Sequence, residues 1–273
     1  MSRSHHLFSI LTILGIITLT NSANAQKQTN EIIYLANEGL MISSGDKQIL
    51  IDALFDDFYE DYLSPDEATI NQMNHGEKPF ESVEAVLVTH IHRDHFEANI
   101  AGKFLSMHEE SKLLSSQQTE GELKEKFDGY AKIKGQIIAV EKNTITTRHE
   151  VNGITVYGFF INHAGGERMS SIHNMAFLIE VNGKRLLHVG DSDMDVERFR
   201  SLNLSQYNID VALIPYWYLS DATGQQIVRD LIQADQHIGI HFPKAPSAMA
   251  LEEIEKQFPE ATVFQTPRQK VGF

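Results

Sequence analysis

The 273-residue sequence contains no cysteine. Disulfide bonds and thiolate ligands are therefore excluded, and any metal ion must be held by nitrogen and oxygen atoms. Basic residues are also scarce, with 23 Lys and Arg against 37 Asp and Glu, which gives a formal net charge of −14. An acidic surface repels long polyanions, so no nucleic-acid partner is expected. A small-molecule substrate is expected instead, because even an anionic one can enter a locally cationic metal site.

A hydrophobic run near the N-terminus is too short to cross a bilayer. The run Leu7–Leu19 has 13 residues, whereas a spanning helix needs about 20. It follows Arg3 and precedes the small residues Ala23 and Ala25, which is typical of a cleaved secretory signal peptide over residues 1–25. No cysteine follows that cleavage site, which argues against a lipid anchor. We therefore expect a periplasmic or secreted protein with no stable membrane anchor after cleavage.

The remainder of the chain has no low-complexity linker, no long Pro/Gly/Ser run and no short-period repeat. This continuity predicts a single domain over residues 26–273. Strand patterns dominate and alternate with a few helical patterns, which favours an α/β (α+β) protein in which two sheets pack face to face with helices outside. The expected strands are 31–36, 39–44, 47–53, 85–90, 112–116, 136–141, 144–151, 154–163, 174–181, 184–191, 210–215, 236–242 and 261–266. The expected helices are 97–107, 120–127, 222–233 and 247–258.

Histidine is concentrated in the stretch THIHRDHF, residues 89–96, directly after a buried apolar strand. Side chains two residues apart in an extended segment point the same way, so His90 and His92 can converge on one metal ion. The chain must then turn before the next helix, which directs Asp94 and His95 toward a second position nearby. This single loop therefore predicts two adjacent metal ions.

One loop cannot fill two coordination shells, since zinc usually takes four ligands. Three more candidates stand at the ends of apolar strands, where loops begin: His163, Asp191 and His241. Each alone has a plain structural alternative, since a strand-end Asp often caps a turn and a lone His is more often a core residue. Their shared position beside the 89–96 stretch favours metal binding by all three.

The order H-x-H-x-D-H at 90–95, then His163, then Asp191 in HVGDSD, then His241, resembles the metallo-β-lactamase superfamily. The resemblance implies a four-layer αβ/βα sandwich with the site at one edge of its two sheets. It also implies that His90, His92 and His163 hold one zinc ion, that Asp94, His95 and His241 hold the other, and that Asp191 bridges them. Asp52, at the end of ILIDALF, matches a position that supports such a site from behind its ligands; a turn-capping role is the alternative.

The presence of Asp191 separates this chain from the true β-lactamases of the superfamily, which lack a bridging aspartate. The stretches EGLMISSGDKQILIDALF (38–55) and NMAFLIEVNGKRLLHVGDSD (174–193) look more like the lactonase and N-acyl-phosphatidylethanolamine phospholipase D-like branch. The resemblance thus implies a hydrolase, but it does not identify the scissile bond.

These residues predict an exported binuclear metal-dependent hydrolase that cleaves an ester, lactone, amide or phosphodiester bond with a metal-bridging hydroxide. Asp94 is the expected catalytic residue, because it can position that hydroxide and carry a proton to the leaving group. The expected cofactors are two Zn²⁺ ions, and Mn²⁺ or Fe suits the same donors. The alternative is a metal-binding protein without turnover, such as a sensor.

Substrate contacts are expected from two further segments. In IPYWYLSDATG (214–224), Tyr216, Trp217 and Tyr218 either line a substrate pocket with an apolar wall or pack under a loop. In DDFYEDYLSPDE (56–67), half of the residues are acidic, which favours a solvated loop; the interleaved Phe58, Tyr59 and Tyr62 indicate a lid as the alternative. His173 lies on the surface, behind the ligands or facing the cleft.

Overall fold

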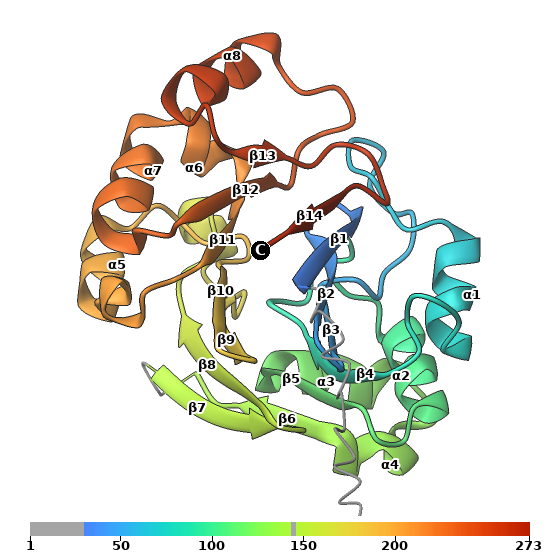
Figure 1. Cartoon of the computed structure of the whole chain (residues 1–273). Coiled ribbons are helices and arrows are strands. Elements are labelled where there is room, and N and C mark those ends of the chain that lie inside the picture. Colours follow the sequence, from blue (N-terminus) through green and yellow to red (C-terminus); the bar gives the residue numbers. More distant parts are fainter. Residues whose placement is uncertain (1–29, 143–145) are drawn as a thin grey trace, which may run out of the picture.

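The strands form two seven-stranded sheets that lie face to face, with helices outside both of them (Figure 1). The structure is a computed structural model that describes residues 30–142 and 146–273. The predicted signal peptide, residues 1–25, lies outside the described residues. The predicted arrangement of two packed sheets flanked by helices is confirmed.

The first sheet holds the N-terminal half of the domain and the last strand of the chain. Its order is β14 (Lys270–Gly272), β1 (Asn30–Ala36), β2 (Gly39–Ser44), β3 (Lys47–Ile51), β4 (Val83–Leu87), β5 (Lys112–Ser116) and β6 (Ile137–Val140). Strands β3 to β6 run parallel, so their carboxyl ends meet at one edge.

The second sheet has the order β13 (Thr262–Val263), β12 (Gln236–Ile240), β11 (Val211–Pro215), β10 (Lys184–His188), β9 (Met175–Val181), β8 (Ile154–Phe160) and β7 (Thr146–Val151). Strands β10 to β13 are parallel, and β7 to β9 form antiparallel hairpins. The β9–β10 turn contains Asn182 and Gly183, the dipeptide expected for a tight hairpin.

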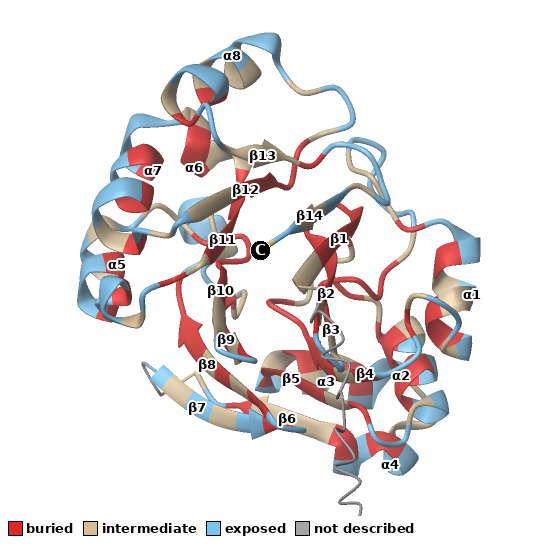
Figure 2. Ribbon diagram, in the orientation of Figure 1, coloured by how far each residue is buried: buried red, intermediate tan, exposed pale blue. Residues whose placement is uncertain are grey.

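Alternating side chains fill three apolar layers. Buried residues accordingly run along the strands of both sheets and recur on the helices (Figure 2). Along β9, Phe177 and Ile179 point between the sheets, while Ala176 and Leu178 point to the outer helices. Both faces of this strand are buried, which explains its nearly continuous apolar sequence. The two sheets are therefore held rigidly against each other, and the loops at their edge start from fixed positions.

The helices divide between the two outer faces. The first sheet is covered by α1 (Glu67–His75), α2 (Ala98–Met107), α3 (Gln117–Lys126) and α4 (Tyr130–Ile133). The second is covered by α5 (Val196–Leu202), α6 (Tyr216–Ser220), α7 (Ala222–Gln226) with the π-helical turn Ile227–Ile232, and α8 (Ala248–Gln257). Short 3₁₀ turns cover Lys134–Gln136, Gly166–Met169 and Leu204–Tyr207. Across the described residues, none of the helices combines the length and apolarity that a bilayer crossing requires.

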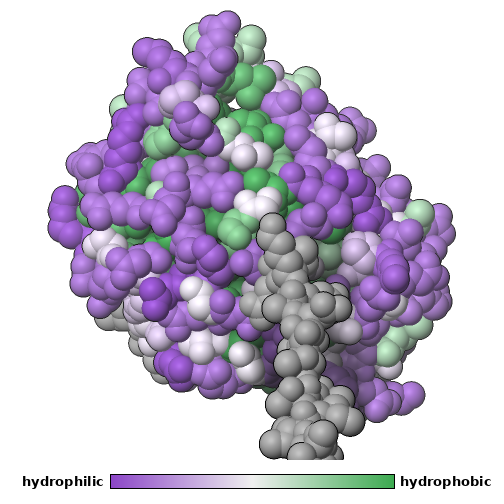
Figure 3. Space-filling view, in the orientation of Figure 1, coloured by the Kyte–Doolittle hydropathy of each residue, from purple (hydrophilic) through white to green (hydrophobic). Residues whose placement is uncertain are grey.

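Several elements differ from the sequence-based expectations. The expected strand 261–266 is only the two-residue β13, and the chain instead ends in β14, which pairs with β1 of the other sheet. The expected helix 222–233 breaks into α7 and a π-helical turn. Helices α1, α4, α5 and α6 were not predicted. The face seen in Figure 3 is mostly hydrophilic, with small scattered apolar areas.

Candidate metal centre

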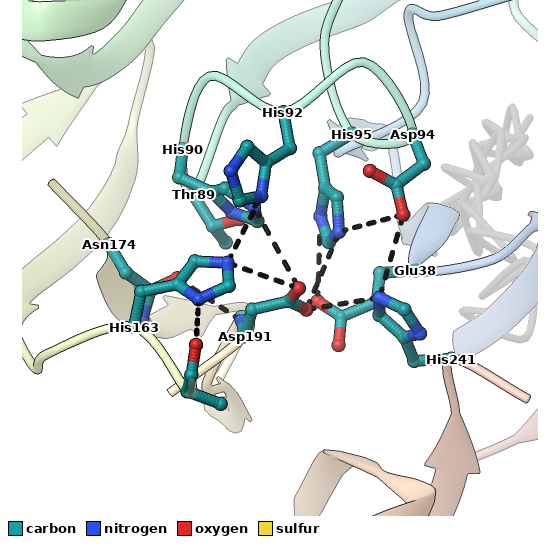
Figure 4. A network of polar contacts seen from close by, with 12 residues as sticks. Glu38, Thr89, His90, His92, Asp94, His95, His163, Asn174, Asp191 and His241 are labelled. Carbon is teal, nitrogen blue, oxygen red and sulfur yellow. Dashed lines mark hydrogen bonds and ion pairs between the residues drawn. The ribbon is translucent and has the colours of Figure 1, made fainter. Parts of the chain in front are cut away.

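The side chains predicted to bind metal converge at the edge where parallel strands end (Figure 4). The loop after β4 carries His90, His92, Asp94 and His95, and the loops after β8, β10 and β12 supply His163, Asp191 and His241. All seven residues predicted from the sequence therefore lie together. They divide into a first group (His90, His92 and His163) and a second group (Asp94, His95 and His241), with Asp191 between them.

The first group consists of three imidazoles that face one another. Nδ1 of His92 lies 3.0 Å from Nε2 of His90 and 3.1 Å from Nε2 of His163. Ligand atoms around one tetrahedral zinc ion stand about 3.4 Å apart, given metal–nitrogen distances of about 2.1 Å. The nitrogens of the first group thus have nearly the separation that one ion requires.

The outer nitrogens fix which inner nitrogens carry lone pairs. Nδ1 of His163 donates to the carbonyl oxygen of Ala164 at 2.5 Å. Thr89 Oγ1 donates its hydrogen to Asp52 Oδ2 at 2.5 Å, so it accepts from His90 Nδ1 at 3.0 Å. In the neutral form, His90 and His163 therefore turn unprotonated Nε2 atoms toward the centre. A hydrogen on His92 Nδ1 could satisfy only one of these two atoms, whereas a cation between the three rings would satisfy all of them. Such outer hydrogen bonds are usual for metal-binding histidines.

The second group shows the same arrangement with a carboxylate in place of one imidazole. Nδ1 of His95 donates to Asp52 Oδ2 at 2.9 Å, which leaves Nε2 of His95 facing inward. Nε2 of His95 and Nε2 of His241 lie 3.8 and 3.7 Å from Asp94 Oδ2. Both Nε2 atoms are buried and have no hydrogen-bond partner among the described residues. Buried unpaired nitrogens are costly, and a bound cation would satisfy both of them.

Asp191 presents one carboxylate oxygen to each group. Oδ2 lies 3.3 Å from His163 Nε2 and 3.8 Å from His90 Nε2. Oδ1 lies 3.2 Å from His241 Nε2 and 3.4 Å from His95 Nε2, and it has no conventional hydrogen bond. This geometry suits a carboxylate shared between two ions.

The charge of the centre also fits two divalent cations. Four acidic side chains of the described residues are buried, namely Glu38, Asp52, Asp94 and Asp191, and no Lys or Arg is buried with them. Buried carboxylates without a cationic partner are strongly destabilising. Two divalent ions would supply positive charge beside these carboxyl groups.

The imidazole pKa values differ between the groups. Burial lowers the pKa of His92 to about 4, with a further contribution from His163, and burial also places the pKa of His90 well below its usual value. These two rings are therefore neutral near pH 7, which is the form that binds metal. Burial also disfavours the charged form of His95, but Asp191 and Asp94 outweigh it and raise its pKa well above normal. That rise reflects the surplus of carboxylates around His95.

The backbone is bent sharply to aim these side chains. Asp52 and His241 have left-handed φ angles of 43° and 58°, which is uncommon for residues other than glycine and is found at functional sites. Gly190, just before Asp191, has φ 58°, and an added Cβ there would lie 2.6 Å from Asn174 Oδ1. Only glycine fits at that position, and Asn174 Oδ1 in turn accepts from the Asp191 amide at 3.1 Å.

Asp52 lies directly behind His95, as expected from the resemblance. It is fully buried and accepts hydrogen bonds from the Thr89 amide at 2.7 Å, from the Thr89 hydroxyl and from His95. This carboxylate joins both groups, since Thr89 also contacts His90. Its position combines the two alternatives, because it anchors the turn at Thr89 and orients a candidate ligand.

The sequence analysis missed two residues of the centre, Asn37 and Glu38. Both are fully buried in the turn between β1 and β2. Burial, reinforced by Asp191, raises the pKa of Glu38 well above its usual value. A polar Asn-Glu pair between two apolar strands was the available signal, but such pairs are also ordinary turn residues.

Aromatic rings flank His241. Tyr62 and Trp217 make edge-on contacts with its imidazole, at ring centroid distances of 4.6 and 5.1 Å, and Tyr216 packs against Trp217 at 5.5 Å. All three are half-buried. Tyr218 is different: it is fully buried, and its hydroxyl donates to the Ser192 and Asp193 carbonyls, so of the two alternatives it takes the packing role.

The acidic segment 56–67 is divided. Phe58 and Tyr59 are 51% and 41% exposed on the surface, whereas Tyr62 reaches His241. The segment is attached to the loop after β12, because the Lys244 amide donates to the Asp61 carbonyl at 2.8 Å. It therefore forms one wall beside the second group. His173 is half-buried, and its amide donates to Gln118 Oε1; among the described residues, no hydrogen bond or ion pair joins it to the candidate ligands.

Comparisons with known proteins agree with this geometry. The model of the beta-lactamase superfamily domain matches residues 47–258. The fold resembles a metallo hydrolase, Igni18, of the archaeon Ignicoccus hospitalis (16% identity, TM-score 0.62, covering 90% of this chain and 98% of that one).

Two further solved structures share the fold and carry different metals in their descriptions. One is Zn²⁺-bound PqqB of Methylobacterium extorquens (13% identity, TM-score 0.60, covering 89% of this chain and all of that one). The other is CmlA, a diiron β-hydroxylase of Streptomyces venezuelae (13% identity, TM-score 0.59, covering 90% of this chain and 54% of that one). Among curated proteins, no sequence is similar enough to count as a relative.

Proposed function

Because the chain belongs to the beta-lactamase superfamily, we propose that it is an exported binuclear metal-dependent hydrolase. Its substrate is a small molecule with an ester, lactone, amide or phosphodiester bond. The first group and Asp191 would hold one divalent ion, and the second group and Asp191 would hold the other. The protein acts in the periplasm or outside the cell, after removal of residues 1–25.

The carboxylate of Asp191 is the observation that carries this proposal. Its two oxygens face different sets of inward-pointing imidazole nitrogens, at 3.3 Å on one side and 3.2 Å on the other. A single-ion site would need only one such set. The four buried carboxylates without a buried Lys or Arg support the same number of ions.

Two ions in such a site lower the pKa of a shared water toward neutrality and polarise the oxygen of the bond under attack. Asp94 would accept the proton of that water. Asn37 Nδ2 fixes Asp94 Oδ2 at 3.1 Å, while no side chain of the described residues hydrogen-bonds to Oδ1. Asp94 remains 8% exposed. We assign Oδ1 as the atom that accepts the proton and passes it to the leaving group.

The aromatic wall supports a substrate with an apolar part. Tyr62 and Trp217 both contact the ring of His241, so an apolar group beside the second group would contact their rings. The Nε1 donor of Trp217 is buried and has no hydrogen-bond partner among the described residues. A substrate oxygen near Trp217 would satisfy this donor.

Zinc is the proposed metal, because the donors are imidazoles and carboxylates in small groups. The same donors also suit Mn²⁺ or Fe. The zinc-bound and diiron proteins of this fold indicate that the architecture accommodates both.

The proposal is tested by metal analysis combined with a substrate panel. The purified mature protein, loaded with Zn²⁺, Mn²⁺ or Fe²⁺, would be assayed against aryl esters, lactones, aryl phosphodiesters and β-lactams. We expect two ions per chain and hydrolysis of at least one class. Two ions without any turnover would favour the sensor alternative, and absence of bound metal would overturn the proposal.

Export is tested separately. We expect the N-terminus of the protein recovered from the periplasm or the medium to be Gln26. A protein that keeps residues 1–25 and stays inside the cell would contradict the proposed localisation.

A further inference from the structure

The turn that joins β1 to β2, residues Asn37 to Gly39, lies against the second group. We propose that this turn is a positioning element that sets the affinity of the second metal position and leaves that of the first unchanged. The inference rests on the proposed function, since it concerns ions that the two groups would hold. It assigns a role to residues that donate no ligand atom.

Asn37 holds two members of the second group at once. Its Nδ2 donates to Asp94 Oδ2 at 3.1 Å and to the Asp94 carbonyl at 3.2 Å. Its own carbonyl accepts from the His241 amide at 3.1 Å. Asn37 is fully buried and has a left-handed φ of 49°. One residue therefore fixes the orientation of a carboxylate from the β4 loop and the backbone of an imidazole from the β12 loop.

Glu38 places a further carboxylate behind the same group. Its side chain is fully buried, and neither oxygen has a hydrogen-bond partner in the part of the chain that the structure describes. Oε2 lies 3.8 Å from His95 Nδ1 and 3.8 Å from His188 Nε2. A buried carboxylate without hydrogen bonds is costly unless positive charge lies nearby. A cation bound beside His95 would supply that charge, so Glu38 favours occupancy of the second position.

Gly39 brings the turn against the residue that orients His95. A Cβ added at Gly39 would lie 2.8 Å from the Asp52 carbonyl oxygen and 2.9 Å from that of Ala36. Both neighbours are backbone atoms that cannot rotate away. The turn is therefore packed directly against Asp52, which accepts the hydrogen bond of His95.

The first group has no such connection. Among residues 30–142 and 146–273, no hydrogen bond or ion pair joins the turn to His90, His92 or His163. The hydrogen bonds and ion pairs of those imidazoles join them to one another, to Thr89, to Ala164 and to Asp191. The ring of His90 also packs against that of His95, at a centroid distance of 4.1 Å, but His95 is not part of the turn. Groups that orient ligands typically change metal affinity by about 10- to 100-fold. An effect of the turn should therefore appear in one of the two ions.

Asn182 offers a matched control. It also occupies a hairpin turn with a left-handed φ, of 48°, and its Nδ2 donates to the Ser44 carbonyl at 2.6 Å. That turn joins β9 to β10 at their other ends, away from the candidate ligands. Asn37→Gly and Asn182→Gly each remove one hydrogen-bonding side chain and neither strains a left-handed backbone. The pair separates loss of positioning from the general cost of altering a turn.

The experiment is a titration of each protein with Zn²⁺ at buffered free concentrations, with bound zinc counted per chain. The unaltered protein should bind two ions. In Asn37→Gly, the second dissociation constant should rise by about 10- to 100-fold while the first stays within about twofold. Asn182→Gly should match the unaltered protein in both.

Glu38→Gln provides an independent test, since it keeps the size of the side chain but cannot form the carboxylate that a bound cation would favour. Its second dissociation constant should also rise by about 10-fold or more, whether or not Asn37→Gly folds. Unchanged zinc binding in Glu38→Gln, equal weakening of both ions in Asn37→Gly, or the same effect in Asn182→Gly would overturn the inference. Binding of fewer than two ions by the unaltered protein would instead refute the proposed function.

Discussion

The imidazoles of His90, His92 and His163 contact one another directly, whereas Asp94, His95 and His241 are held by residues behind them. Within the first group, inner nitrogens lie 3.0 and 3.1 Å apart. Within the second, the two Nε2 atoms lie 3.7 and 3.8 Å from Asp94 Oδ2, and neither has a hydrogen-bond partner among residues 30–142 and 146–273. The two halves share Asp191 but differ in what shapes them.

This difference indicates which ligands are oriented by residues next to them in sequence and which depend on distant parts of the chain. The first group has outer hydrogen bonds to nearest neighbours in sequence, Thr89 and Ala164. The second depends on Asn37 and Asp52, which come from other strands. We therefore expect the first position to depend on a few local contacts and the second to depend on the packing of β1, β2 and β3.

The largest expected effect comes from removing one ligand of each half. His92→Ala and Asp94→Ala should each lower the rate of hydrolysis by at least about 10³-fold, or about 4 kcal/mol in the activation barrier, because both ions are needed for the reaction. His75→Ala is the control, since His75 is an exposed helix-end residue. Unaltered rates in either ligand variant, measured on the substrate found in the panel, would refute the assignment.

Removal of metal should affect the two halves unequally. An ion present at about 1,000 times its dissociation constant stabilises the folded state by about 4 kcal/mol. Chelation should lower the melting temperature by roughly 8–16 °C per ion lost, at about 2–4 °C per kcal/mol for a chain of this size. Calorimetry measures this shift.

Hydrogen exchange then locates the change. After chelation, the amides of His241 and Lys244, which bond to Asn37 and Asp61, should exchange faster, while the amide of Val88, bonded to Leu114, should stay protected. Equal acceleration at these amides would show that the two halves are equally supported.

Asp52→Asn should have an intermediate effect, because Asp52 contacts both halves. Loss of its charged hydrogen bonds to Thr89 and His95 should cost about 1–3 kcal/mol of stability. The dissociation constant of the second ion should rise by about 10- to 100-fold, and that of the first ion should rise less. The control is Asp56→Asn, which removes an exposed pair with Arg93 and should change stability by less than about 1 kcal/mol. Similar losses in both variants would argue against the role of Asp52.

The smallest effect is a gradual one with pH. The pKa values of His92 and His188 are lowered to about 4 in the folded protein, below the value of 6.5 for an unperturbed histidine. Between these values the unfolded chain binds more protons at these two positions. Their contribution to the free energy of unfolding should therefore fall as pH drops from about 6.5 to 4, and it should be constant above 6.5. Protonation of His92 should also release the first ion over that range. Urea titrations at constant free zinc test this; a stability that rises toward pH 4 would contradict it.

Much of the centre could be predicted because its ligands follow strand ends in a fixed chemical pattern. The motif at residues 89–96 can be recognised from eight consecutive residues. His163, Asp191 and His241 each end an apolar strand pattern. The face-to-face packing of two sheets with helices outside was also expected. Strands such as β9 have sequences that are typical of burial on both faces.

The missed elements depend on distant contacts. Strand β14 is stabilised by pairing with β1, more than 200 residues away in sequence, and its three residues carry no periodic pattern. Glu38 looks like an ordinary turn residue until its burial beside His95 is known. Helix α6 begins at Tyr216 directly after β11. Its short aromatic sequence has no helical periodicity, because packing against the neighbouring strands decides which of its side chains are buried.

The central claim is that two ions share the carboxylate of Asp191. Anomalous diffraction at the zinc edge from crystals of the loaded protein tests it most directly. The account predicts two peaks about 3.5–4 Å apart, one among the imidazoles of the first group and one among the second group. A single peak, or ions bound elsewhere on the chain, would contradict it.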